Sequence, residues 1–242
     1  MDKVFHRLLN AGYTINLQKC QFLPPTLLYL GHIIEDGIIR PNPKKVEAIQ
    51  LLKSPPTSHE VRSLLGVAGF LQAFIPNYSQ VTAPITDLLK GVPNKKTRAV
   101  KINWTTKCDD ALTELKRLVI DSALVQPLDG DEFLLEVDAC SYAIGGVLKL
   151  KRGGAWLPVH YVSRKLNATE QNWPIREKEA FAIIYCLQKL DYYVKSRHIV
   201  VVTDHQSLKW LMDAKSGKLA RWAILLSEYD LDIQFRKGSE NY

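Results

Sequence analysis

The stretch FLLEVDACSYAIGGVL, residues 133–148, decides the fold that we predict for this chain. Its first five residues are mostly apolar and β-prone, so they predict a buried strand, and Asp138 follows at the strand's end. An aspartate that ends an isolated strand is typical of a turn. A second β-branched run, IVVVT at residues 199–203, also ends in an aspartate, Asp204. Two strands that each deliver an aspartate to their carboxyl end predict a functional site at one edge of an α/β sheet.

A helix predicted over residues 175–190 supplies a third carboxylate. Glu179 and Ile183 lie on its apolar face, whereas Glu177 lies about 200° around the helix from Glu179. We therefore expect Glu179 to point toward the sheet and Glu177 to point toward water. A carboxylate on a buried face needs a partner or a metal ion, so Glu179 joins the two aspartates as a candidate site residue.

Three converging carboxylates point to metal chemistry. Without a cation they would repel one another and raise their own pKa values. Hard oxygen ligands suit Mg²⁺ or Mn²⁺, and clustered carboxylates underlie two-metal phosphodiester chemistry. The six histidines show no spacing typical of metal ligands. For His205, beside Asp204, two roles are open: contact with substrate or a neighbouring strand, and ordinary packing. Asp109 and Asp110 fall in the first turn of a predicted amphipathic helix, where acids favour the helix dipole, so we assign them a structural role.

Length and composition limit the number of domains, the kind of partner and the kinds of site that this chain can have. The chain has 242 residues, 46% of them apolar, which is enough for one or two domains with packed cores. Its net charge of +7 favours an anionic partner, with nucleic acid first. The sequence has no stretch apolar and long enough for a membrane span and no signal peptide at its start, so we expect an intracellular protein. The cysteines are too widely spaced for a zinc site or a disulfide framework, and free thiols are expected at Cys20, Cys108, Cys140 and Cys186.

The chain divides into three predicted parts. Residues 1–39 contain a short helix that ends near Asn10, strands around 13–17 and 27–34, and an Asp36–Gly37 turn. These strands are too few for a stable sheet unless they pack onto later residues or onto partners outside the chain. Residues 40–100 carry three helices, two of them opened by capping signals, and a polar basic linker at 91–101. Residues 101–242 begin with a helix and continue in the order strand, strand, strand, helix, strand, helix, helix, strand.

The whole chain resembles a known family in many segments that follow one fixed order. The later segments DACSYAIGGVL, LPVHYVSRKLNATEQNWPIREKEAFAII, VVTDHQSLKWL and LARWAILLSEYDLDIQF are similar to the ribonuclease H domain of gypsy-type LTR retrotransposon polyproteins. The segments KCQF and YLGHII are similar to the end of the reverse transcriptase palm with its primer grip. The segments PNPKKVEAI, VRSLLGVAGFLQAFIPNYS and APITDLL are similar to its thumb.

The resemblance implies an α/β fold, namely a ribonuclease H-like mixed sheet with flanking helices in 101–242, preceded by a palm remnant in 1–39 and a helical thumb in 40–100. It implies hydrolysis of the RNA strand of RNA–DNA hybrids with Mg²⁺ or Mn²⁺ at Asp138, Glu179 and Asp204. It also implies that Lys19 lies near an incoming nucleotide and that a primer strand lies against Tyr29, Leu30, Gly31 and His32. Hybrid, primer-template and upstream reverse transcriptase segments are the implied partners, inside retroelement particles in the cytoplasm or nucleus.

The sequence departs from the family pattern in three places. Cys140 replaces a usual serine, which is a nearly isosteric change. The YxDD-type polymerase signature does not occur in the chain. The family's fourth ribonuclease H carboxylate is expected just beyond Asn241, so we expect a two-ion site that is incomplete, weak or undetectable cleavage by these residues alone, and apolar surface left uncovered at strand 231–235. Two alternatives stay open: a catalytically dead nucleic-acid-binding remnant, and an integrase-type nuclease, although that class places its glutamate after both aspartates.

Phosphate contacts from a basic surface are expected to dominate nucleic-acid binding. We expect the basic residues to flank the carboxylates, from a hairpin near residue 151 and from the late helices. The candidates are Lys149, Lys151, Arg152, Lys218 and Arg221. A solvated charged face is the alternative for each of them.

Overall fold

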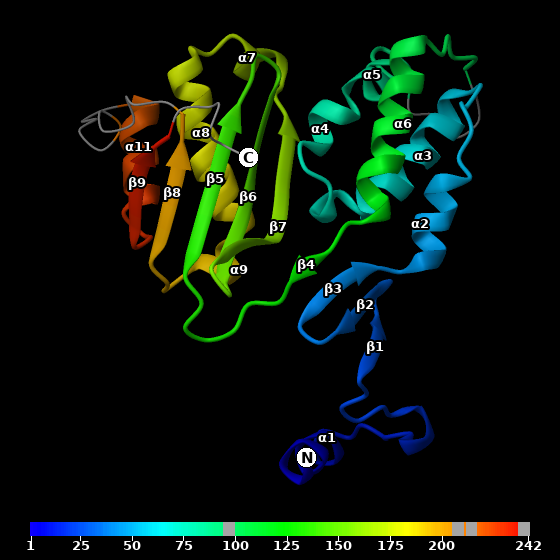
Figure 1. The fold of residues 1–242 in the computed structure, drawn as a ribbon, viewed down its shortest axis with the longest axis vertical. Helices are drawn as coiled ribbons and strands as arrows, with labels where there is room; N and C mark the ends of the chain where they lie inside the picture. The colour runs from blue at the N-terminus through cyan, green and yellow to red at the C-terminus, as the bar shows by residue number, and fades with distance from the viewer. Residues whose placement is uncertain (94–99, 205–210, 212–216, 237–242) are drawn as a thin grey trace.

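The computed structural model describes residues 1–93, 100–204, 211 and 217–236. Figure 1 shows a sheet with its helices beside a cluster of helices, and a small sheet and the first helix below them. In the described residues, no helix has the length and apolar character needed to cross a membrane.

The larger sheet has five strands in the order β7-β6-β5-β8-β9. Strand β5 (Phe133–Ala139) pairs antiparallel with β6 (Ala143–Arg152), which pairs antiparallel with β7 (Ala155–Lys165). On its other side β5 pairs in parallel with β8 (Ile199–Thr203), and β8 pairs in parallel with β9 (Leu231–Phe235). The predicted mixed sheet is confirmed, and each predicted strand of this part is present.

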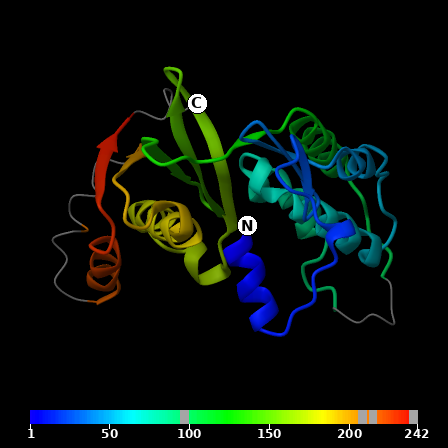
Figure 2. The same cartoon turned by 90° about the horizontal axis from the view of Figure 1, so that it is seen from below.

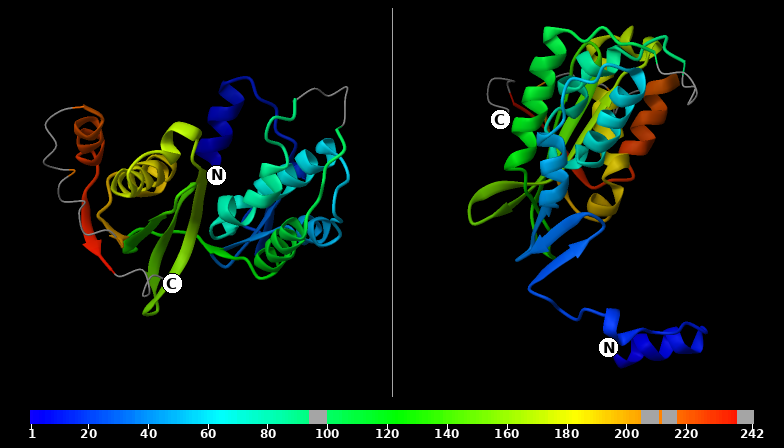
Figure 3. Two further views of the ribbon diagram at one scale, coloured as in Figure 1. Left: turned by 90° about the horizontal axis from the view of Figure 1, so that it is seen from above. Right: turned by 90° about the vertical axis from the view of Figure 1, so that its right-hand side faces the viewer.

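Helices cover one face of this sheet (Figures 2 and 3). They are α8 (Ile175–Lys189) and α11 (Gly217–Leu226), with the short helices α7 (Ala168–Gln171) and α9 (Asp191–Val194) nearby. Because side chains alternate along a strand, Leu135 and Val137 enter the core under α8, while Glu136 and Asp138 lie on the other face. On that other face the short helix α4 (Tyr78–Val81) contacts β6 and β7, and we call this face the open face.

The helical cluster has a core of its own. It contains α2 (Pro43–Gln50), α3 (Ser58–Phe70), α4 (Tyr78–Val81), α5 (Ala83–Asp87), α6 (Thr106–Ile120) and the 3₁₀ turn Gln72–Phe74. The predicted caps form: the side chain of Asn42 accepts a hydrogen bond from the N–H of Lys44, and that of Thr57 accepts one from the N–H of Glu60.

Helix α6 packs differently from the prediction. We assigned residues 101–242 to one domain, but the apolar side of α6 lies in the core of the helical cluster. Its residues Leu112, Leu115 and Val119 are buried there because α2, α4 and α5 offer the nearest apolar surface. The packing therefore places α6 with the helices before it. The domain boundaries remain predictions, and most of the predicted linker, 94–99, lies outside the described residues.

The N-terminal part forms a small sheet that borrows a strand from later in the chain. Its order is β1 (Thr26–Tyr29), β2 (His32–Glu35), β3 (Ile38–Pro41) and β4 (Leu124–Val125). The single strand predicted over 27–34 is wrong, because Leu30 and Gly31 turn the chain between two strands. The strand predicted over 13–17 is also wrong: among the described residues this segment pairs with no strand, and it leads into the 3₁₀ turn Leu17–Lys19. Helix α1 (Asp2–Asn10) forms as predicted but buries no residue.

The hairpin β1–β2 docks on the helical cluster through its turn. Leu30 and Gly31 both have positive φ, 48° and 82°, as a two-residue hairpin turn requires. The ring of His32 stacks on Phe70, with centroids 5.1 Å apart, and burial lowers the pKa of this histidine. A Cβ atom on Gly31 would lie 2.8 Å from Cζ of Phe70. Glycine therefore suits position 31 for two reasons: it adopts the positive φ without strain, and it has no Cβ that would contact Phe70.

Gly31→Ala is expected to lower the free energy of unfolding more than Gly37→Ala does. Both glycines have positive φ, which costs alanine about 1–2 kcal/mol, but the position of a Cβ on Gly37 has no atom within 4 Å. The contact with Phe70 should add about 1–3 kcal/mol for Gly31. Urea denaturation measures the difference, and Phe70→Leu should restore much of it. Equal effects of the two substitutions would show that the docking contact carries no energy.

Candidate functional site

The fold brings the three predicted carboxylates together. Strands β5 and β8 are parallel with Glu136 opposite Val202, so Asp138 and Asp204, two residues further on, leave the sheet side by side. Glu179 reaches the same edge from the second turn of α8. One ligand oxygen from each carboxylate lies within 4.8 Å of those of the other two. Sequence spacing and tertiary packing thus select the same three residues.

Burial and mutual repulsion disfavour the charged form of this cluster. Glu179 is only 2% exposed, and Thr203 Oγ1 donates a long hydrogen bond of 3.5 Å to its Oε2. Desolvation first, then the charges of Asp204 and Asp138, raise the pKa of Glu179 to about 8. Desolvation and Asp204 also raise the pKa of Asp138. A cation would relieve this repulsion, and an all-carboxylate donor set suits hard divalent ions such as Mg²⁺ or Mn²⁺.

A cleft of about 640 Å³ opens beside the carboxylates, between the open face of the sheet and the helical cluster. Asp138 and Asp204 lie in its wall on the sheet side, with Glu136, Lys149 and Tyr161. The wall on the helical side includes Pro76, Asn77, Val81, Glu114, Arg117 and Leu118. The site is therefore open to a ligand that contacts both parts of the chain.

The helical cluster is attached close to the carboxylates. Asp138 faces Gly145 across the strands, and Gly145 faces Ser163 on β7. The N–H of Ser79 donates to Oγ of Ser163 at 2.9 Å, and Lys165 forms an ion pair with Asp87. This end of α4 thus meets the sheet in the same cross-strand row that carries Asp138.

The prediction that Glu177 points to water is wrong. Its side chain is 18% exposed and accepts a hydrogen bond of 2.5 Å from Lys218 on α11. The ammonium of Lys218 also lies 3.7 Å from the ring centroid of Trp173 and 5.1 Å from that of Trp222. The packing of α11 beside α8 covers Glu177, which the periodicity of one helix cannot reveal. Lys218, predicted to contact phosphate, is engaged in holding two helices together.

Lys218→Met is expected to destabilise the chain by about 2 kcal/mol, because it removes a desolvated cation–π contact and leaves Glu177 without its partner. Arg221→Met is the matched control, since Arg221 is exposed on the same helix. Urea denaturation measures both, and adding Glu177→Gln to Lys218→Met should recover part of the loss. A Lys218→Met chain with normal stability but weaker hybrid binding would favour the original phosphate prediction.

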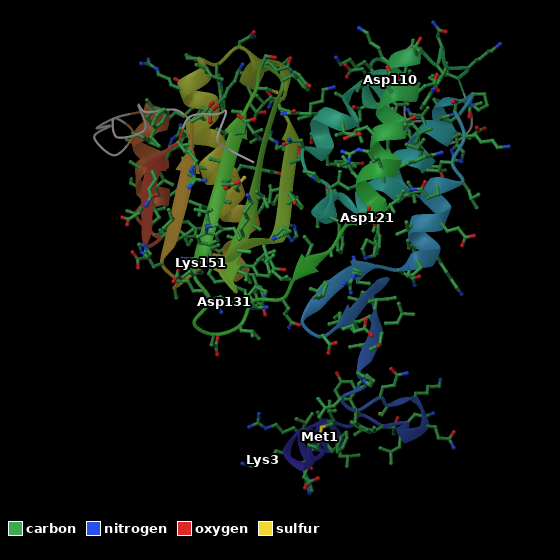
Figure 4. The ribbon with its side chains drawn as sticks, viewed as in Figure 1. Met1, Lys3, Asp110, Asp121, Asp131 and Lys151 are labelled. Atoms are coloured by element: carbon green, nitrogen blue, oxygen red, sulfur yellow. The ribbon has the colours of Figure 1, made fainter. Side chains whose placement is uncertain are left out.

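The basic candidates do not form one surface around the carboxylates. Lys151 pairs with Glu132, and Arg152 pairs with Asp131, at the β6–β7 hairpin. Seven residues separate Arg152 from Gly145, which is the partner of Asp138, so the hairpin lies about 20 Å along the sheet from the site. Figure 4 shows Lys151 and Asp131 at the lower end of the sheet. The expectation that this hairpin flanks the carboxylates is wrong. Because β5 and β6 are antiparallel, the hairpin lies at the end of the strands opposite to Asp138.

Of the basic residues predicted to contact phosphate, Lys149 lies in the wall of the cleft. It pairs with Glu136 at 2.5 Å, and both side chains are largely buried. Glu136 also pairs with Arg236 at 3.6 Å. Arg221 is exposed on α11. Phosphate contacts by Lys149 and Arg221 remain predictions.

The residues predicted to form a primer grip lie at the β1–β2 turn, apart from the carboxylates (Figure 1). Tyr29 and Leu30 are exposed, whereas Gly31 and His32 are turned against Phe70. Lys19 is exposed at the end of the first 3₁₀ turn. Contact of these residues with a primer strand or nucleotide remains a prediction.

The remaining sequence assignments concern structure. Asp109 accepts hydrogen bonds from Ser54 and Trp104, which fits its structural role, and Figure 4 shows Asp110 at the upper end of α6. The free thiols are confirmed, with Cys108 and Cys186 buried. On β9 the outward residues Asp232 and Gln234 are polar, whereas Phe235 is 42% exposed, so the predicted apolar surface there is confined to the strand's end. His205 lies outside the described residues.

Sequence reasoning missed several residues around the site. Glu136 precedes Asp138 by two, the strand period that puts both on the open face, and this signal was readable. Asn77 and Ser79 come from the helical cluster, and no local pattern ties them to a strand 84 residues away from Ser79. Lys178, next to Glu179, is 6% exposed. A lysine beside a glutamate on a helix gives no sign of burial.

The comparisons with known proteins agree with the geometry. Residues 129–229 match the model of the RNase H-like domain found in reverse transcriptase. The chain is 36% identical over 241 residues to the retrovirus-related Pol polyprotein from transposon 297 of Drosophila melanogaster, which covers 98% of this chain and 22% of that protein. It is 30% identical over 247 residues to the transposon Tf2-3 polyprotein of Schizosaccharomyces pombe, covering 99% of this chain and 18% of that protein. The chain thus spans about a fifth of the length of these relatives.

Solved structures show the same fold. The foamy viral protease-reverse transcriptase in complex with an RNA/DNA hybrid has a TM-score of 0.75 at 23% identity, covering 98% of this chain and 32% of that one. A complex of that protein with double-stranded DNA has a TM-score of 0.74 at 24% identity, covering 97% and 42%. The matches favour the reverse transcriptase interpretation over the integrase alternative. Residues 129–229 are therefore an RNase H-like domain of the kind found in reverse transcriptase, in a chain that belongs to the Pol polyproteins of gypsy-type LTR retrotransposons.

Proposed function

We propose that the RNase H-like domain of this chain hydrolyses the RNA strand of RNA–DNA hybrids with divalent metal ions held by Asp138, Glu179 and Asp204. The observation that carries the proposal is the convergence of these three carboxylates within 4.8 Å. The RNA/DNA hybrid bound by the structurally similar foamy viral enzyme supports the choice of substrate. We further propose that the chain acts inside a larger reverse transcriptase polyprotein, in retroelement particles within the cell.

The residues of the chain have separate roles in this proposal. Divalent ions bound here would supply an activated water for attack on phosphorus and a charge to stabilise the leaving oxygen. Asp138 and Asp204, on adjacent parallel strands, set the spacing of the ligand oxygens. Glu179 is almost fully buried, and its pKa of about 8 leaves it largely protonated at neutral pH in the metal-free chain. A bound cation would favour its deprotonated form, so that it could serve as a ligand.

The cleft suits a nucleic acid only when cations are present. Its wall carries the acids Glu114, Glu136, Asp138 and Asp204 against the bases Arg117 and Lys149. Arg117 is engaged by Glu114 and Lys149 by Glu136. A phosphate backbone would meet uncompensated negative charge at the two aspartates, so we expect strand binding in the cleft to depend on Mg²⁺ or Mn²⁺.

The test is a cleavage assay in Mn²⁺ with a 5′-labelled RNA strand, presented in an RNA–DNA hybrid, in an RNA duplex and alone, and with a 5′-labelled DNA strand, presented in the hybrid and in double-stranded DNA. At most weak cutting of the RNA in the hybrid by these residues alone, and no cutting of a labelled DNA strand, is expected, with loss of any products in EDTA. Products that persist in EDTA or arise from double-stranded DNA would reject the proposal. Hybrid binding that weakens between about 50 and 200 mM salt without any cleavage would instead support the binding-only alternative.

A further inference from the structure

We infer that Lys178 is a positioning residue, which ties the strand that carries Asp138 to the helix that carries Glu179. The side chain of Lys178 is 6% exposed, and its Nζ donates a hydrogen bond of 3.1 Å to the carbonyl oxygen of Ser141. The inference rests on the proposed function of the carboxylate site and names a residue that supports it.

The connection is short on both sides. Ser141 follows Asp138 by three residues, and Lys178 immediately precedes Glu179. The hydrogen bond therefore links the turn that follows Asp138 to the residue before Glu179, and so crosses from the end of β5 to α8. Near the site the backbone N–H of Ala139 also donates to the carboxylate of Glu179, so Lys178 supplies a second polar link between the two elements. Residues that orient metal ligands in this way contribute to metal affinity even though they do not touch the ion.

The turn over residues 140–142 is otherwise attached to different elements. The N–H of Cys140 donates to the carbonyl of Ala143 at 2.9 Å, and the N–H of Leu166 donates to the carbonyl of Tyr142 at 2.8 Å. Gln80 Nε2 donates to Sγ of Cys140 at 3.7 Å. These bonds hold the turn to β6, to the end of β7 and to the helical cluster. The bond from Lys178 holds it to α8.

The burial of this ammonium is itself informative. Covering a lysine costs free energy unless its donors and charge are compensated. Among the described residues, the partner of Lys178 is the Ser141 carbonyl, and no ion pair to a carboxylate forms. A buried lysine of this kind is poor for stability alone. Its position beside Glu179 gives it a function that an apolar residue would not supply.

The experiment compares Mn²⁺ affinity, by isothermal titration calorimetry, in the wild-type chain and in Lys178→Met. Positioning predicts affinity on the order of 10-fold weaker. A purely electrostatic role predicts the opposite, because removing a positive charge beside three carboxylates would tighten cation binding. Lys178→Arg, which keeps charge and donors, should retain most of the affinity. Lys189→Met is the control, since it removes an equal charge from an exposed site at the far end of α8.

A second measurement uses the metal-free chain. Hydrogen exchange at the amides of residues 140–142 should become faster in Lys178→Met, while exchange along β8 stays unchanged. If the methionine variant does not fold, Lys178→Gln serves, because its shorter amide keeps a donor that does not reach as far. Unchanged or tighter Mn²⁺ binding by a folded variant would overturn the inference. Failure of the wild-type chain to bind Mn²⁺ would instead count against the proposed function.

Discussion

Asp138→Asn is expected to weaken Mn²⁺ binding on the order of 100-fold or more, and to abolish hybrid cleavage with it. The substitution preserves shape and removes one of three carboxylate ligands at the end of β5. A neutral amide neither attracts the cation nor offers a second anionic oxygen. Isothermal titration calorimetry with Mn²⁺ measures the affinity, and the labelled hybrid measures the activity.

Asp138→Asn is also expected to change the pKa of the neighbouring Glu179. The charge of Asp138 contributes to the raised pKa of Glu179, after desolvation and Asp204. Its removal should therefore lower the pKa of Glu179 toward its ordinary value, which carboxyl NMR can follow in the metal-free chain. Asp110→Asn is the matched control, because it removes an equal charge at an exposed position on α6, outside the carboxylate cluster. Equal loss of Mn²⁺ affinity in both variants would show that net charge, and not this site, governs binding.

Glu179→Gln is expected to have opposite effects on stability with and without metal. In the metal-free chain the folded state holds the proton of Glu179 up to a pKa of about 8, against an ordinary value of 4.5. The folded state thus binds more protons than the unfolded state between these values. The stability of the wild-type chain should fall as pH rises from about 4.5 to 8, by an amount on the order of a few kcal/mol. Asp138, whose pKa is also raised, adds to the fall in the same direction.

The Glu179→Gln variant lacks the titrating group at position 179, so it loses the contribution of Glu179 to the pH dependence of stability. At pH 5 in EDTA the variant should match the wild type, and at pH 8.5 it should be more stable by a few kcal/mol. With saturating Mn²⁺ near pH 8 the order should reverse, because the ion stabilises the folded wild type and binds the variant poorly. Urea denaturation at each condition gives the free energies. Glu47→Gln, at an exposed position on α2, should show neither effect. A variant that is less stable than the wild type at pH 8.5 in EDTA would contradict the electrostatic account.

Sequence alone determined the strand ends and the face of Glu179, and with them the candidate site. The reason is that strands and helices have fixed periods, so a carboxylate after a β-branched run or on an apolar helix face has one possible direction. Helix caps at Asn42 and Thr57 were readable for a similar reason, since the capping bond spans two or three residues. Family resemblance supplied the rest of the fold and the expected chemistry.

Only the tertiary structure decided which surfaces meet. The packing of α11 beside α8 makes Glu177 and Lys218 a partly buried ion pair. Antiparallel pairing of β5 and β6 places Lys151 and Arg152 at the end of the sheet opposite to Asp138. Helix α6 joined the helical core because its apolar side found its neighbours there. Lys178 became a link between two carboxylate-bearing elements through one hydrogen bond to Ser141. Each of these outcomes depends on contacts between residues far apart in the chain, for which local periodicity carries no signal.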